Sequence, residues 1–153
     1  INIKRAVEKM SESVKANNQK DKNELRESAR QLFISALDAH KLAAVKAPMS
    51  SDIWESFAVA AETVANYDPT LLDDVISAYE KTAELNPTNP LIYIRLAKLK
   101  IIMADAAISA KKNEKSNNTK SPEATKLYRE AKDCYNKAIE LKKLREAYEG
   151  LAT

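Results

Sequence analysis

The sequence predicts an all-α protein built from stacked antiparallel helical hairpins, with about seven helices. Glycine occurs once in 153 residues, whereas a β-rich chain of this length would need many tight turns, and such turns favour glycine. Apolar residues recur at intervals of three and four along most of the chain, as on one face of an α-helix. An N-cap residue directly precedes proline at three positions, which is a typical start of a helix.

The first part of the chain is expected to form one hairpin and the helix that follows it. Helices are predicted near 2–18 and 21–46, and Pro48 marks the end of the second. Residues 15–22 are polar and lysine-rich and include no candidate core residue, so they are expected to form an exposed hairpin tip. A third helix is predicted at 51–67.

The central helices are placed by two of the cap and proline pairs. Asp68-Pro69 predicts a helix at 69–86 that ends before Pro87. Asn89-Pro90 predicts the next helix at 90–115. The Asp and Asn side chains can accept hydrogen bonds from free amides of the first turn, and proline is tolerated there because its missing N–H would have had no partner.

The last part of the chain repeats this arrangement. A second lysine-rich polar stretch, 111–120, is expected to form another exposed tip. Ser121-Pro122 then predicts a helix at 122–142. A final helix is expected at 144–152, and because the chain ends within it, we expect it to be truncated. The two polar stretches lengthen the hairpins in which they lie.

An internal repeat underlies these elements. One spacing of small, aromatic, small and closing residues occurs in three segments: Val75, Tyr79, Thr82 and Pro87; Ala36, His40, Ala43 and Pro48; and Ala131, Tyr135, Ala138 and Lys143. The following helices align as well, since Trp54 lies six positions beyond Pro48 and Tyr93 lies six positions beyond Pro87. We therefore expect a single domain, 1–153, with units at 1–48, 51–87 and 90–142 and a truncated end at 144–153.

These residues resemble the tetratricopeptide repeat family. The run Ala78-Tyr79-Glu80-Lys81-Thr82-Ala83-Glu84-Leu85-Asn86-Pro87 is similar to the end of such a repeat, and Leu91-Ile92-Tyr93-Ile94-Arg95-Leu96-Ala97 to the start of the next. The resemblance is specific at 51–100 and good at 124–152. The chain departs from the family at Thr82 and Lys143, where Ala and Pro are usual, and two hairpins are about five and about twenty-two residues longer.

A second, narrower resemblance concerns the protein to which this chain could belong. Lengthened repeats of this kind resemble the soluble tails of bacterial O-antigen ligase-like membrane proteins. The chain begins with Ile1 rather than methionine, so we expect an excised domain of a larger protein. Its apolar runs are too short to cross a bilayer, so no membrane contact is expected of this fragment itself. A soluble domain on either side of a membrane fits these observations.

The family resemblance implies a binding groove lined by the first helices of successive repeats. Carried over by position, the groove residues would be Glu55, Ser56, Val59 and Glu62 from one repeat and Leu91, Arg95, Lys98 and Ile102 from the next. Some family members hold a peptide carboxylate with Lys and Asn, but Glu55 and Val59 occupy those positions here. Arg95 and Lys98 fit an acidic segment, and the alternative that they are solvated surface stays open.

The inventory of catalytic residues argues against an enzyme. His40, the single histidine, takes a packing position of the repeat, and Cys134, the single cysteine, lies on an apolar helix face. Asp73-Asp74 falls in a first helical turn, where negative charge is favourable. No ligand spacing for a metal and no phosphate-binding loop is present, so neither a cofactor nor a metal is expected.

A protein or peptide is therefore the expected partner. The formal net charge is +3, but Lys and Arg alternate with Glu and Asp along the helices, so no nucleic-acid partner is expected. Two alternatives to a peptide-binding scaffold remain. The repeats could be a spacer within a larger cell-envelope protein, or they could form homo-oligomers through the apolar faces of their exposed ends.

Overall fold

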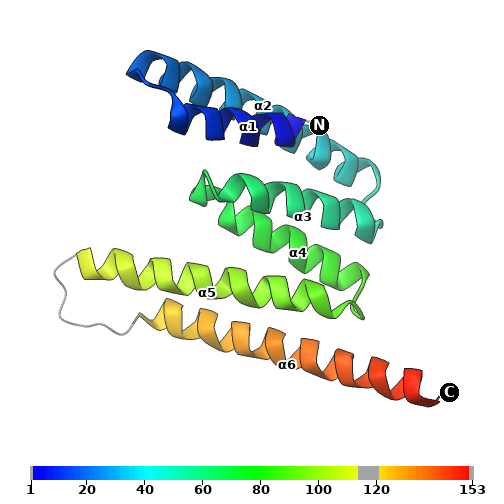
Figure 1. The fold of residues 1–153 in the computed structure, drawn as a ribbon. Helices are drawn as coiled ribbons and strands as arrows, with labels where there is room; N and C mark the ends of the chain where they lie inside the picture. Colours follow the sequence, from blue (N-terminus) through cyan, green and yellow to red (C-terminus); the bar gives the residue numbers. More distant parts are fainter. Residues whose placement is uncertain (1, 114–120, 152–153) are drawn as a thin grey trace. The chain divides into compact units, whose positions relative to one another are not determined.

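The all-α prediction is confirmed by a computed structural model, which describes the backbone of residues 2–113 and 121–151 and the side chains of 2–110 and 121–143. Within these ranges there are six α-helices, one short 3₁₀ helix and no strand (Figure 1). The elements in order are α1 (Asn2–Lys15), α2 (Gln19–Lys46), α3 (Ser51–Ala65), η1 (Pro69–Leu71), α4 (Leu72–Leu85), α5 (Pro90–Asn113) and α6 (Pro122–Leu151).

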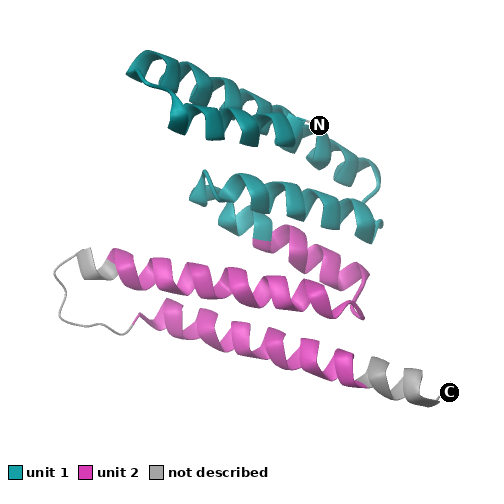
Figure 2. Ribbon diagram, viewed as in Figure 1, with its two compact units in different colours: residues 1–75 teal, residues 76–153 magenta. Residues whose placement is uncertain are grey.

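The chain divides into two compact units, residues 1–75 and 76–153 (Figure 2). The division falls inside α4, and therefore inside the second predicted repeat unit, 51–87. The first unit holds α1, α2, α3, η1 and the start of α4. The second holds the rest of α4 with α5 and α6, and the two units are described separately below.

All three predicted cap and proline pairs begin helices. The Asp68 carboxylate accepts a hydrogen bond from the Thr70 amide at 3.2 Å. In the same way Asn89 Oδ1 accepts from the amide of the second residue after it at 3.0 Å, and Ser121 Oγ accepts from the amide three residues on at 3.3 Å. Each cap satisfies an amide that the helix leaves without a carbonyl partner. Because the cap and the amide are close in sequence, these helix starts could be predicted from a few neighbouring residues.

The first lysine-rich tip is shorter than predicted. Residues 16–18 connect α1 to α2, whereas Gln19–Lys22 of the expected tip already belong to α2. The reason is a cap that was not predicted, because Asn18 Oδ1 accepts from the Asp21 amide at 2.8 Å and Asn18 Nδ2 donates to the Asp21 carboxylate at 2.8 Å. In the second tip α5 extends to Asn113, and residues 114–120 lie outside the described residues.

The expected break between a sixth and a seventh helix is absent, because α6 runs without interruption from Pro122 to Leu151. Sequence reasoning placed the break at Lys143, the counterpart of Pro48 and Pro87. Lysine keeps its backbone N–H and can continue the helical hydrogen-bond ladder, which proline cannot. The prediction of separate helices at 122–142 and 144–152 is therefore wrong.

The core of the first unit lies between α1, α2 and α3. Its buried members are Ala6, Ala29, Phe33 and Val64, and partly buried apolar side chains surround them. Ala6 and Ala29 are fully buried, and their small size lets α1 and α2 approach closely. Phe33 and Val64 join this hairpin to α3, and the Phe33 ring stacks on Tyr67 with 5.3 Å between ring centroids.

The core of the second unit combines large residues of α4 and α5 with alanines of α5 and α6. Tyr79 and Ile92 are fully buried, and Leu96 is 3% exposed. Alanines recur at seven-residue intervals in buried positions, Ala97 and Ala104 in α5 and Ala124, Ala131 and Ala138 in α6. Helices α5 and α6 pack against each other, and a seven-residue spacing keeps these small residues on one face of each helix.

Positions aligned in the repeat have related environments. Trp54 Nε1 donates to the Pro48 carbonyl at 3.0 Å, and Tyr93 Oη donates to the Pro87 carbonyl at 3.3 Å. In both cases the aromatic side chain six residues after the proline bonds back to the connection between two helices, α2 and α3 in one case and α4 and α5 in the other. The three aligned small residues, Val75, Ala36 and Ala131, are all buried. One exception is Ile139, which is 53% exposed although its counterpart Ala44 is buried.

Candidate functional site

The predicted groove residues of the first unit lie along one face of α3. Glu55, Val59 and Glu62 follow the four and three spacing of a helix, so they form a stripe. Val59 is 39% exposed, and the two glutamates are half-buried. The stripe is therefore partly accessible and carries negative charge, while Ser56, the remaining predicted groove residue of α3, is exposed and contacts His40 of α2.

The predicted groove residues of the second unit form a longer stripe on α5. Leu91, Arg95, Lys98 and Ile102 follow each other at intervals of four, three and four. Leu91 is 62% and Ile102 50% exposed, so an apolar side chain lies at each end of a basic centre. The guanidinium carbon of Arg95 lies 5.8 Å from the centre of the Tyr79 ring, a cation–π contact that restrains the arginine.

The two stripes belong to different units, residues 1–75 and 76–153, so each is a surface in its own right. The α3 stripe is acidic and the α5 stripe is basic and apolar. Neither contains a histidine or a cysteine. What each can offer is therefore contact area and charge, which suits binding of a chain of complementary charge.

Sequence reasoning missed a polar network in the second unit. Lys100 is 8% exposed, and its ammonium group donates to Glu80 of α4 at 3.0 Å and to Glu130 of α6 at 2.8 Å. A signal was present, because Lys100 lies four residues after Leu96 on the buried face of α5. The network ties three helices together, and it is satisfied within the chain rather than available for a ligand.

The charges in this network reinforce one another. Burial by itself would lower the pKa of Lys100, but the hydrogen bonds to Glu130 and Glu80 outweigh it and raise the pKa above its ordinary value of 10.5. The hydrogen bond from Lys100 lowers the pKa of Glu130 below its ordinary value of 4.5. Lys100 and Glu130 are therefore both charged near neutral pH, which is the state in which their hydrogen bond is strongest.

Cys134 lies beside this network in an open hollow of about 620 Å³ that is also lined by Glu84, Asp133 and Tyr93. The thiol is half-buried, and burial raises its pKa above the ordinary value of 9.0. A raised pKa keeps sulfur protonated at neutral pH, and the protonated form is a poor nucleophile. The expectation that this cysteine has a packing role is consistent with these surroundings.

His40 belongs to the first unit and contacts α3. Its Nδ1 lies 3.4 Å from Ser56 Oγ, a long contact that links α2 to α3. A catalytic serine would need a shorter hydrogen bond, a third group that orients the histidine, and amides positioned for an oxyanion. None of these is found around Ser56 in the described part of the chain, so the contact has the properties of helix packing.

Comparisons with known proteins name no relative. No protein-family model matches this sequence, and no curated protein sequence is significantly similar to it. Among the residues that the structure describes, no group of three or more His, Cys, Asp or Glu side chains could hold a metal ion. In the same residues, no helix has the length and apolar character that crossing a membrane requires.

Proposed function

We propose that this chain is a tetratricopeptide-type scaffold that binds a peptide or a partner helix along the first helices of its hairpins. The observation that carries the proposal is the α5 stripe, in which exposed Leu91 and Ile102 bracket Arg95 and Lys98. Covering exposed leucine and isoleucine with a partner removes apolar surface from water, which is favourable, and adjacent cations select an acidic partner. The hairpin repeat supports the same interpretation, since the family's scaffolds bind through these helices.

The binding of a partner by α5 can be tested by charge reversal. The double variant Arg95→Glu/Lys98→Glu is compared with Lys126→Glu/Arg129→Glu, which reverses two charges on exposed positions of α6. Because Arg95 also contacts Tyr79, the single variant Lys98→Glu is included, and circular dichroism checks that each variant is folded. Affinity capture from cells of the source organism, followed by measured binding of each captured protein, is the readout.

The outcomes separate the proposals. A partner that loses affinity only with the α5 variants supports the scaffold. A partner that binds all variants equally removes the α5 stripe as the site. Absence of any saturable partner for the unmodified chain would contradict the scaffold and favour a spacer within a larger protein.

Self-association is the alternative with a specific observation in its favour. Near the end of α2 and in the turn after it, Leu42, Val45 and Met49 are 55%, 69% and 79% exposed. Such exposed apolar residues can pair in a symmetric contact between copies. Sedimentation equilibrium distinguishes the two: a dimer that Val45→Asp dissociates supports self-association, whereas a monomer at high concentration contradicts it.

A further inference from the structure

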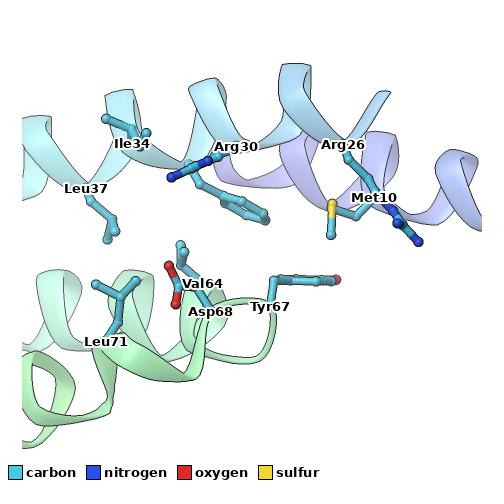
Figure 3. Close-up of a pocket in the computed structure, with 10 residues that line it drawn as sticks. Met10, Arg26, Arg30, Ile34, Leu37, Val64, Tyr67, Asp68 and Leu71 are labelled. Atoms are coloured by element: carbon cyan, nitrogen blue, oxygen red, sulfur yellow. The ribbon is translucent and has the colours of Figure 1, made fainter. Parts of the chain in front are cut away.

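The first unit contains a pocket of about 370 Å³ that no part of the α3 or α5 stripe lines (Figure 3). Its apolar walls come from every element of the unit before α4: Met10, Phe33, Leu37, Val64, Tyr67 and Leu71. Arg26, Arg30 and Asp68 supply the charged groups of the lining. Pockets that bind ligands typically measure roughly 300–1,000 Å³, so this one is large enough for one or two bulky side chains.

The pocket exists because the chain turns sharply after α3. The amides of Tyr67 and Asp68 both donate to the Val64 carbonyl, at 2.8 and 3.0 Å, so the backbone leaves the helix within one turn. This turn places the Tyr67 ring against Phe33 at an interplanar angle of 28°. The apolar walls are therefore fixed by backbone hydrogen bonds and ring stacking before any ligand arrives, which lowers the entropic cost of binding.

Two arginines give the pocket its charge. Arg26 and Arg30 are one helical turn apart on α2 and both are exposed, and the charge of Arg30 helps to lower the pKa of the Asp68 carboxyl across the pocket. The single carboxylate of the lining, Asp68, accepts at Oδ1 from the Thr70 hydroxyl at 2.6 Å and from the Thr70 amide at 3.2 Å. One carboxylate balances at most one of the two guanidinium charges, so the pair retains the capacity to bind a further anion.

The charge around these arginines argues for a particular kind of anion. Residues 1–75 contain ten Lys and Arg against twelve Asp and Glu, a formal net charge of −2. A polyanion such as nucleic acid gains from an extended basic surface, which two arginines in a unit of net negative charge do not provide. A peptide needs only local complementarity, because one apolar side chain can enter the pocket while neighbouring carboxylates reach Arg26 and Arg30.

We infer that this pocket is an anchor site for an acidic peptide segment, in which a large apolar side chain occupies the space between Phe33, Tyr67 and Leu71 and adjacent carboxylates pair with Arg26 and Arg30. The site goes beyond the proposed groove, since none of its residues belongs to either stripe. It would add a second contact to a partner held along α3 of the same unit, and it stands whether or not the stripes bind.

A labelled-protein NMR titration tests the inference on the full chain. The probe is a short acetylated and amidated peptide in which one phenylalanine lies between glutamates. The expected result is saturable shifts of backbone amides confined to 26–37 and 64–71, weakened by added salt. A peptide with glutamine for glutamate, and another with alanine for phenylalanine, should each bind about tenfold more weakly or not at all.

Protein variants identify the residues responsible. Arg26→Glu and Arg30→Glu should each weaken binding about tenfold, whereas Arg5→Glu, an exposed arginine of α1 in the same unit, should change it less than about twofold. Arg30→Lys keeps the charge and the fold but loses the planar fork, so an intermediate affinity is expected. Circular dichroism confirms that each variant retains its helices.

Three results would overturn the inference. Equal weakening by Arg5→Glu and Arg30→Glu would show that only overall charge matters. Amide shifts confined to α3 or α5 would move the peptide to the stripes, which supports the proposed scaffold and removes this pocket. Saturation of the pocket by decanoate at concentrations where the peptide leaves it unchanged would assign it to a fatty-acid ligand instead.

Discussion

Truncation of Leu96 gives the sharpest test of the packing in the second unit. Leu96 is 3% exposed, so Leu96→Ala removes nearly the full transfer free energy of the lost groups and leaves a cavity. Such substitutions typically cost about 2–5 kcal/mol. Leu96 also lines the open hollow near Cys134, so water can fill part of the space that is left. We therefore expect the lower part of that range, about 2–3 kcal/mol.

The same helix supplies a matched control. Leu91→Ala makes the identical chemical change at a side chain that is 62% exposed, and it should alter the free energy of unfolding by less than about 0.5 kcal/mol. Urea unfolding followed by far-ultraviolet circular dichroism measures both. With a urea dependence of about 2 kcal/mol per M, the midpoint of Leu96→Ala should fall by about 1–1.5 M. Equal losses in the two variants would refute the register assigned to α5.

Three further outcomes follow from contacts of the second unit. Tyr93→Phe removes the hydrogen bond to the Pro87 carbonyl and should lower the free energy of unfolding by about 0.5–1.5 kcal/mol in urea; no change would mean that solvent replaces this bond without cost. The pKa of Glu130 is lowered in the folded state, so its pairing with Lys100 stabilises the fold at pH values above the ordinary pKa of 4.5, and this stability is lost as the pH falls through the folded pKa. Glu130→Gln should therefore lose less stability in acid than the unmodified chain. Parallel acid profiles of the two proteins would contradict this. Burial raises the pKa of Cys134, so iodoacetamide should alkylate it more slowly than it alkylates glutathione at mildly alkaline pH, and the rate should increase in urea. A rate equal to that of glutathione would show an exposed thiolate.

Helix starts were predictable because their causes are local. At Asp68, Asn89 and Ser121 the cap residue, the proline and the satisfied amide all lie within four residues. The alignment of Trp54 with Tyr93 was also available from the sequence, since the spacing of each from the preceding proline is local, and both side chains donate to that proline's carbonyl. Such features depend on one turn of chain, so a single sequence contains them.

Other features depend on distant parts of the chain and could not be read in this way. The position of Lys100 on the buried face of α5 was readable, but its partners Glu80 and Glu130, 20 and 30 residues away in sequence, reach it from two other helices. The arginine-lined pocket requires the turn at Tyr67 to meet α2. The break expected at Lys143 rested on analogy with proline, and a residue that can continue a helix followed its own propensity instead.

The alanines of α5 and α6 make this hairpin unusual as a target for mutagenesis. Substitution to alanine, the common way to find a contact, changes nothing at Ala97, Ala104 or Ala131, because the contact is already made by a methyl group. An alanine scan would therefore give no information on these buried positions. The informative scan runs in the opposite direction, since each added methylene must force two closely approached backbones apart, and intolerance to enlargement becomes the measure of contact.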